Sequence, residues 1–331
     1  MTEQVDDDPT VAHRETVREL CRAGGPLDRE GPHATTANPA WFRGRNVERP
    51  TAARDALHRA LLDETRAEHP ATRAERRAIV LAGPPGAGKS TVLRDVLGLD
   101  KGAWLTIDAD EFKHKLLREA LQDGSYDRFL KPPEVAQREQ VDGERFFPLE
   151  LASLVHEESS YLAKQLQREA MREGTNIVID SVLSDASKAL ALGRALEAAG
   201  YTVEVIDVEV PYELSQERIA GRWRESYQNA LTTGSGLGGR WVPSVYARSV
   251  FDTPTGRSKS QDSAAHLAQG CGAVERYRRF WTPNATAGRV VEVDQSRRLR
   301  GEALVDTALL RGVTRGGRGG RSVRYGRLPE R

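Results

Sequence analysis

One eight-residue segment constrains the fold of this chain more than any other. It reads Gly83-Pro84-Pro85-Gly86-Ala87-Gly88-Lys89-Ser90 and matches G-x-x-x-x-G-K-[ST] at every fixed position. An apolar, β-branched run over 78–82 precedes it, as expected for a buried parallel strand. The residues 91–97 that follow are typical of the first turns of a helix. A strand, a glycine loop and a helix in this order predict a site for a nucleoside triphosphate.

The loop residues predict how such a nucleotide is held. Glycines let backbone N–H groups converge on phosphate oxygens at a helix N-terminus, where the helix dipole also favours anions. Lys89 would reach the β and γ phosphates, and the Ser90 hydroxyl suits a Mg²⁺ ligand. We therefore expect ATP or GTP together with Mg²⁺. The expected nucleotide contacts are Gly83, Pro84, Pro85, Gly86, Ala87, Gly88, Lys89, Ser90 and Thr91.

The bulk composition excludes several classes of protein. The formal net charge of the 331 residues is +1, which argues against a molecule whose main partner is nucleic acid. Cys21 and Cys271 are the only cysteines, without metal-ligand spacing, and this usage favours a reducing compartment. The acidic N-terminus is followed by no apolar signal region, and no stretch approaches 18 consecutive apolar residues. We expect a cytoplasmic protein without a membrane partner.

The chain divides into four segments by pattern. Residues 1–50 predict a mostly irregular extension with one short helix over 10–22, and residues 51–75 a helical lead-in. Alternating strands and helices over 76–300 predict an α/β domain of the P-loop NTPase or kinase-like type, a parallel sheet with helices on both faces. Residues 301–331 form an arginine- and glycine-rich tail, whose composition predicts disorder and favours a solvated segment over one that binds RNA.

Two local predictions within the domain concern helix boundaries. Ser159 and Ser160 are suitable N-cap residues for a helix that ends at Gly174. We expect the segment 260–282 to contain one more helix, and residues 287–293 to form one more strand.

Acidic side chains stand at the ends of predicted strands. Asp108 and Asp110 follow the second strand, and Asp180 ends the third. Ligands of open parallel sheets bind beyond the carboxyl ends of the strands, so these carboxylates should share an edge with the phosphate loop. Asp110 is the better candidate for a base that accepts a hydroxyl proton, and Asp180 for the metal side. Asp108 is favoured as an N-cap of the next helix over a catalytic role.

Arginines gather after the fourth strand. Arg218 and Arg222 share one helix face, Arg224 lies on the same helix, and Arg240 follows a glycine-rich loop. Guanidinium groups brought over a phosphoryl group in transfer would stabilise its developing charge.

These segments together resemble the zeta-toxin family of P-loop kinases over about 76–250. The matching stretches are the phosphate loop 83–90, Ile107-Asp108-Ala109-Asp110-Glu111-Phe112-Lys113, residues 174–180, Gly200-Tyr201, Val210-Pro211 and Arg240-Trp241-Val242-Pro243. The resemblance implies that Asp110 is the base and that Lys89, Arg222 and Arg240 act on the phosphoryl group. It also implies an antitoxin protein as a partner.

Known members of that family phosphorylate UDP-N-acetylglucosamine, so the resemblance implies this nucleotide-linked acceptor. We expect Asp108 and Lys113 to contact it, together with Glu158 and Ser159, which would stand in for family residues that this chain lacks. The chain departs from the family after the third strand, where Asp180-Ser181-Val182-Leu183-Ser184 lacks an expected arginine. A kinase of NAD or of a free metabolite is therefore an alternative. An RNA-binding ATPase or RNA end kinase recruited by the tail is an alternative from another class.

Overall fold

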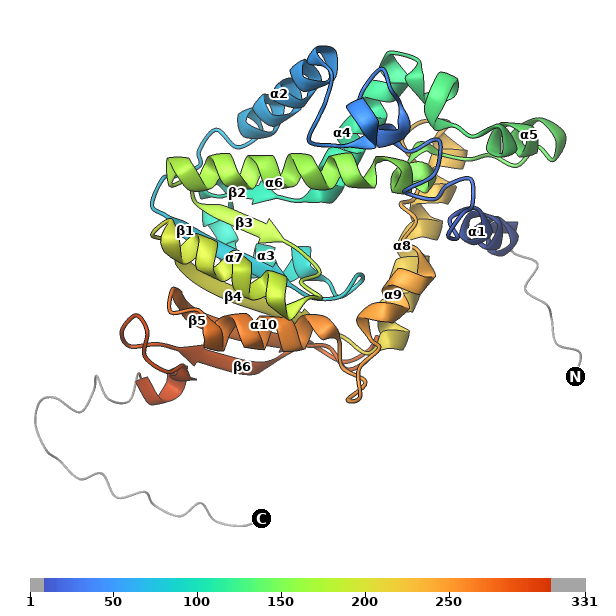
Figure 1. Ribbon diagram of the computed structural model, residues 1–331. Coiled ribbons are helices and arrows are strands. Elements are labelled where there is room, and N and C mark those ends of the chain that lie inside the picture. The colour runs from blue at the N-terminus through green and yellow to red at the C-terminus, as the bar shows by residue number, and fades with distance from the viewer. Residues whose placement is uncertain (1–8, 311–331) are drawn as a thin grey trace, which may run out of the picture.

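The computed structural model describes residues 9–310. Of the tail predicted over 301–331, residues 311–331 lie outside the described part, and residues 305–306 form a short strand, contrary to the prediction. Seven strands form one sheet in the order β2-β3-β1-β4-β5-β6-β7 (Figure 1). The strands are β1 (Arg77–Ala82), β2 (Leu105–Ile107), β3 (Ile177–Asp180), β4 (Thr202–Glu209), β5 (Val274–Trp281), β6 (Val290–Ser296) and β7 (Val305–Asp306). The first five strands pair in parallel, and β6 and β7 add an antiparallel edge. The predicted α/β class is confirmed, with this edge as an addition.

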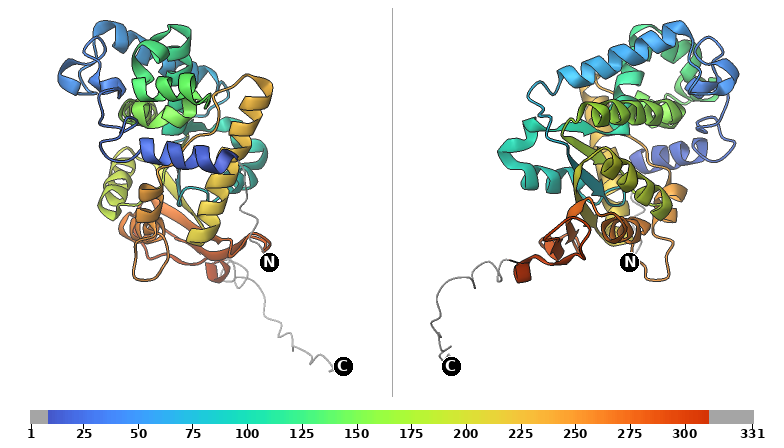
Figure 2. Two further views of the ribbon diagram at one scale, coloured as in Figure 1. Left: turned by 90° about the vertical axis from the view of Figure 1, so that its right-hand side faces the viewer. Right: turned by 60° about the vertical axis from the view of Figure 1, so that its left-hand side comes forward.

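Helices cover both faces of the sheet (Figures 1 and 2). They are α1 (Pro9–Leu20), α2 (Ala52–Ala67), α3 (Lys89–Leu97), α4 (Ala109–Gln122), α5 (Pro133–Val141), α6 (His156–Glu173), α7 (Ala186–Ala198), α8 (Tyr212–Thr233), α9 (Ser244–Val250) and α10 (Lys259–Gly270). Alternate residues of β1 separate two cores: Ala78 and Val80 face α4, α6, α7 and α10, whereas Ile79 and Leu81 face α3 and the start of α8. No helix of residues 9–310 is both long and apolar enough to cross a membrane.

The segment 260–282 contains the predicted helix, α10, but the strand β5 that follows Gly270 was not predicted. This strand is rich in charged residues, so its sequence does not resemble that of a buried strand. Arg278 and Arg279 are neutralised by acids of the neighbouring β4, with Arg278 Nη2 2.6 Å from Glu204 and Arg279 Nε 2.8 Å from Asp207. A register irregularity near Val274 also breaks the alternation that would have indicated a strand.

The N-terminal extension packs into the main core although little of it is regular. Val17, Leu27 and Phe42 are almost completely buried. Val17 and Leu27 belong to the same cluster of apolar side chains as β1 and β3. The extension therefore contributes to the stability of the domain that carries the phosphate loop.

Candidate functional site

The phosphate loop joins β1 to α3 and needs glycine where it meets its neighbours. Gly83 has φ of 142°, and a Cβ there would lie 2.2 Å from the carbonyl oxygen of Val208 in β4. Gly86 has φ of 75°, and a Cβ there would lie 2.7 Å from the carbonyl oxygen of Ser215 in α8. Only glycine fits these two contacts without moving the backbone. The loop is thereby held against the central strands and against α8.

Side chains of α8 also fasten the loop. The Ser215 hydroxyl donates to the carbonyl of Pro85 at 2.8 Å. Arg218 Nη1 donates to the carbonyl of Ala87 at 3.3 Å. The spacing of Arg218 and Arg222 predicts a shared helix face but does not indicate this contact, because the contact depends on the tertiary packing of α8 on the loop.

A cavity of about 590 Å³ lies beyond the carboxyl ends of the strands and adjoins the loop. Lys89 and Asp110 both line it, as the argument from strand ends predicts. Its polar lining also includes Asp108, Lys113, His156, Ser160, Lys164, Asp180, Arg240 and Tyr246. Lys89 Nζ donates to the carbonyl of Gly83 at 3.0 Å and lies 3.6 Å from Asp180 Oδ1.

Asp110 is held between two cations at the cavity wall. Lys113 Nζ lies 3.0 Å from its Oδ1, and Arg240 Nη1 lies 2.5 Å from its Oδ2. Burial alone would raise the pKa of Asp110, but the charges of Lys113, Arg240 and Lys89 outweigh it and lower this pKa to about 2. The carboxylate is therefore ionised and oriented before a substrate arrives.

The other two carboxylates have the opposite environment. Asp108 caps α4, as predicted, by accepting a hydrogen bond from the backbone N–H of Asp110 at 2.8 Å. Burial, and then the charges of Asp180 and Asp110, raise the pKa of Asp108 to about 7. Burial also raises the pKa of Asp180, although the charge of Lys89 opposes it. Crowded carboxylates of this kind favour a bound cation.

The donor set suits Mg²⁺ better than a metal enclosed by protein. Ser90 is an exposed residue in the first turn of α3, and Asp180 lines the cavity. No cluster of three or more His, Cys, Asp or Glu side chains that could hold a metal exists within residues 9–310. Mg²⁺ commonly takes one or two protein oxygens and completes its shell with phosphates and water, which fits Ser90 and Asp180.

Arg222 lies near the cavity but is not part of its lining. Burial, and then the positive charge of Arg240, lower the pKa of Arg222. The guanidinium groups of Arg222 and Arg240 are therefore close enough to interact electrostatically near Asp110. The structure places Arg240 in contact with Asp110, whereas Arg222 forms no ion pair with the residues described here.

Residues 140–258 match the family model described as zeta toxin. This match covers about a third of the chain. The matched segment includes Asp180, Arg222 and Arg240, and it begins after the phosphate loop and Asp110. The cavity is therefore lined both by residues inside the matched segment, such as Asp180 and Arg240, and by residues before it, such as Lys89 and Asp110.

Solved structures show the same fold over most of the chain. The AvrRxo1-ORF1:-ORF2 complex with ATP has a TM-score of 0.53 at 18% identity, covering 81% of this chain and 74% of that one. The complex with sulphate ions has a TM-score of 0.53 at 19% identity, covering 88% and 79%. A guanylate kinase of Prochlorococcus marinus (strain MIT 9312) is 42% identical over 57 residues, which span 17% of this chain and 29% of that relative.

The structure corrects two predicted substrate contacts. Glu158 is fully buried, where it accepts a hydrogen bond from Arg54 Nε at 2.6 Å and lies 2.7 Å from His58 Nε2. Ser159 is also fully buried, and its hydroxyl donates to the carbonyl of His156 at 2.9 Å. Both lie within α6, which begins at His156 because a 3₁₀ segment over 148–155 leads directly into it. Neither Ser159 nor Ser160 is an N-cap.

Neighbouring residues take the place of Glu158 and Ser159 at the cavity. His156 and Ser160 line it, one helical face away from the buried pair. Burial, followed by the charges of Lys113 and Arg29, lowers the pKa of His156 to about 4, so its imidazole is neutral near pH 7. Tyr246 of α9 also lines the cavity, and no sequence signal distinguished it from other surface tyrosines.

Proposed function

We propose that this protein is a kinase that transfers the γ-phosphoryl group of ATP, or of GTP, to a hydroxyl of a nucleotide-linked small molecule. The observation that carries the proposal is the placement of Lys89 and Asp110 on one cavity beyond the phosphate loop. The contacts of Asp110 with Lys113 and Arg240 support a role for its carboxylate in orienting an acceptor. The similar fold that was solved with ATP supports the choice of nucleotide.

The geometry suggests how the residues divide the work. The loop would hold the nucleotide phosphates, and Lys89 would exchange its contact with Gly83 for the β and γ oxygens. Asp110 would accept a hydrogen bond from the acceptor hydroxyl and then its proton. The acceptor oxygen bonds to the γ phosphorus as the bond from that phosphorus to the oxygen of ADP breaks. Arg240 and Arg222 would stabilise the charge that develops on the phosphoryl oxygens.

A divalent ion belongs to the proposal as well. Ser90 and Asp180 would hold Mg²⁺ beside the loop, and the ion supplies positive charge that neutralises the phosphate oxygens. Asp108 and Lys113 would contact the acceptor, since both line the cavity next to Asp110.

The first acceptor to test is UDP-N-acetylglucosamine, which the family resemblance favours. NAD and free metabolites are the alternatives. They are worth testing because the cavity is lined by Lys164 and Ser184, the second of which lies in the segment 180–184 where the chain departs from the family. Incubation with labelled ATP, Mg²⁺ and a panel of nucleotide sugars, dinucleotides and free sugars should yield one labelled product, identified by mass spectrometry. Transfer to an RNA end, with no labelled small molecule, would contradict the proposal.

A protein partner that restrains the enzyme is a further part of the proposal. The similar solved structures are complexes of two different chains, which supports a partner such as an antitoxin. The chain isolated from its native source should then carry a second protein, and phosphoryl transfer should rise when that protein is removed. Equal activity before and after its removal would exclude a restraining partner.

A further inference from the structure

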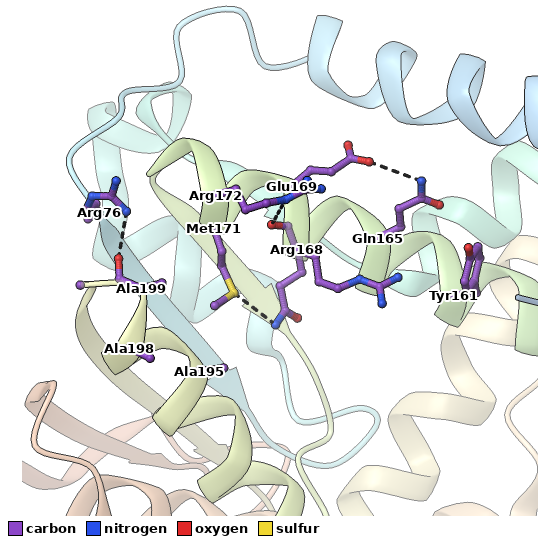
Figure 3. A pocket seen from close by; sticks show the side chains of 12 residues that line it. Arg76, Tyr161, Gln165, Arg168, Glu169, Met171, Arg172, Ala195, Ala198 and Ala199 are labelled. Atoms are coloured by element: carbon purple, nitrogen blue, oxygen red, sulfur yellow. Dashed lines mark hydrogen bonds between the residues drawn. The ribbon is translucent and has the colours of Figure 1, made fainter.

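The cavity that holds Asp110 has two different ends along α6 and α7. His156, the first residue of α6, and Asp185, the N-cap of α7, line it at the starts of the two helices. Further along the helices, Gln167 and Ala195 line both this cavity and a second one of about 910 Å³. Figure 3 shows this second cavity between α6 and α7. The cavity at Asp110 is therefore continued toward the ends of the helices.

Tyr246 of α9 lies at the opposite end, beside the start of α6. Burial raises the pKa of Tyr246, as does the charge of Asp110, whereas the charges of Arg240 and Arg29 oppose this rise. The same three charges act on the pKa of His156, which burial lowers. Interactions between charges weaken beyond about 10 Å in salt solution. Tyr246 and His156 thus belong to one end of the cavity, near Asp110.

The packing of α9 directs Tyr246 toward the cavity. Ala247 is almost completely buried against Ile219 of α8 and Val242. Residue 246 stands one position earlier, about 100° around the helix, so its side chain leaves this packed face and lines the cavity. Tyr246 is 44% exposed. Its ring is therefore accessible to a molecule in the cavity.

Ser184 approaches Tyr246 from the segment that follows β3. Burial raises the pKa of Tyr246, and a hydrogen bond with the Ser184 side chain opposes this rise. Leu183 has φ of 53°, a left-handed conformation that is uncommon for leucine, and its side chain is buried in the main core. Its backbone N–H donates to Ser181 Oγ at 3.0 Å. Constrained turns of this kind gather at ligand sites, and this one fixes Ser184 opposite Tyr246.

We propose that Tyr246 binds the acceptor, with its ring packed against the part that carries the reacting hydroxyl, and that Ser184 positions this ring. The inference rests on the proposed kinase function and adds an acceptor-binding residue and a positioning residue to it. The acceptor enters between α6 and α7 and meets Tyr246 beside Asp110. A neutral phenol supplies contact area there without competing with Lys113 and Arg240 for the carboxylate.

The kinetics of Tyr246→Ala test the binding role. The acceptor is the member of a panel of UDP-N-acetylglucosamine, NAD and free sugars that the wild-type protein phosphorylates. Its KM should rise about tenfold or more, because the aromatic contact is lost. The value of kcat and the KM for ATP should stay within about threefold of wild type. Val245→Ala is the matched control, since Val245 of α9 is 84% exposed and outside the cavity lining, and it should change no constant.

Tyr246→Phe and Ser184→Ala test the positioning role. Each variant removes the same hydrogen bond and keeps the ring, so each should raise the KM for the acceptor by about threefold. The double variant should resemble either single variant, because only one interaction is lost. Additive effects of the two substitutions, or no effect of either, overturn the role of Ser184.

An unchanged acceptor KM in active Tyr246→Ala overturns the inference and leaves the kinase proposal intact. A fall in kcat as large as the rise in KM also overturns it, because Tyr246 would then only support Arg240 in the same segment. If the wild-type protein phosphorylates no member of the panel, the kinase proposal fails. Calorimetric titration of the protein–ADP complex with UDP-N-acetylglucosamine and with NAD then decides the inference. Weaker binding to Tyr246→Ala supports it, whereas equal binding, or no binding to wild type, overturns it.

Discussion

At the scale of single residues, the role proposed for Asp110 requires a carboxylate with a low pKa to accept a proton. Its two cations hold the pKa at about 2, so it is a weak base at rest. A loose phosphoryl transfer needs little proton removal before the transition state, and orientation of the hydroxyl matters more than basicity. Contact with the γ-phosphate would also draw Arg240 away from Asp110 and raise the pKa of that carboxyl group.

Asp110→Asn tests this role without changing the shape of the side chain. We expect kcat for phosphoryl transfer to fall by about 10²–10⁴-fold, because the amide cannot accept the proton. The affinity for ATP should stay the same or increase, since Lys113 and Arg240 lose their anionic partner beside the phosphates. Transfer rates and calorimetric ATP titrations measure the two effects. An equal loss of ATP binding and of transfer would contradict the assigned role.

Asp108 offers a residue-scale prediction about pH. Its pKa of about 7 means that it loses its proton as pH rises through neutrality, which adds negative charge beside Asp180. Mg²⁺ should therefore bind the protein–ADP complex more weakly at pH 6 than at pH 8. In Asp108→Asn this pH dependence should largely disappear, as measured by competition with a metal indicator. A pH ratio that is unchanged in the variant would show that another group is responsible.

At the scale of elements, the contact between the phosphate loop and α8 depends on Gly86. A side chain at this position meets the backbone of Ser215 and also demands a left-handed conformation. We expect Gly86→Ala to destabilise the fold by about 1–3 kcal/mol and to weaken ATP binding by tenfold or more, because the loop must move away from α8. Unfolding in urea and ATP titration measure these effects.

A matched control exists outside the phosphate loop. Gly124 has φ of 73°, close to that of Gly86, but its nearest neighbour would be the flexible side chain of Arg128. Gly124→Ala should therefore carry the conformational cost and leave ATP binding unchanged. If both variants lost ATP affinity equally, the contact with α8 would not be the cause.

The elements near the loop were predictable because their signals are local. The apolar run of β1, the glycines and the N-cap Asp108 act within a few residues, and the structure has them where the sequence indicates. The strand β5 was missed because its arginines find acidic partners only across the sheet, on β4 and β6. The contact of Arg218 with the loop was missed for the same reason, since 131 residues separate the bonded pair.

At the scale of the whole molecule, a buried charge cluster ties the helical lead-in to the domain. Glu158 of α6 is fully buried between Arg54 and His58 of α2, about a hundred positions away in the sequence. The sequence predicts a substrate contact for this glutamate, because a charged residue near the site looks the same in sequence as a structural one whose partner is distant. Its burial shows that α2 belongs to the scaffold of the site.

Glu158→Gln should strongly destabilise the protein, because it leaves the buried guanidinium of Arg54 without its counter-charge. We expect a loss of about 3–5 kcal/mol of unfolding free energy at pH 7, measured by urea unfolding. Glu173→Gln is the matched control, since Glu173 pairs at 2.8 Å with Arg66 across the same two helices but is half exposed. That variant should cost less than about 1 kcal/mol. Equal losses would show that burial does not set the strength of this link.

The difference between wild type and Glu158→Gln should also depend on pH. Burial would raise the pKa of Glu158, but Arg54 and His58 outweigh it and lower this pKa to about 2, below the value of an unfolded glutamate near 4.5. The stabilisation is therefore complete above about pH 4.5 and is lost as pH falls toward 2, by about 3 kcal/mol in all. Wild type and variant should converge in unfolding free energy over this range, whereas a constant difference would mean that the charge of Glu158 contributes nothing.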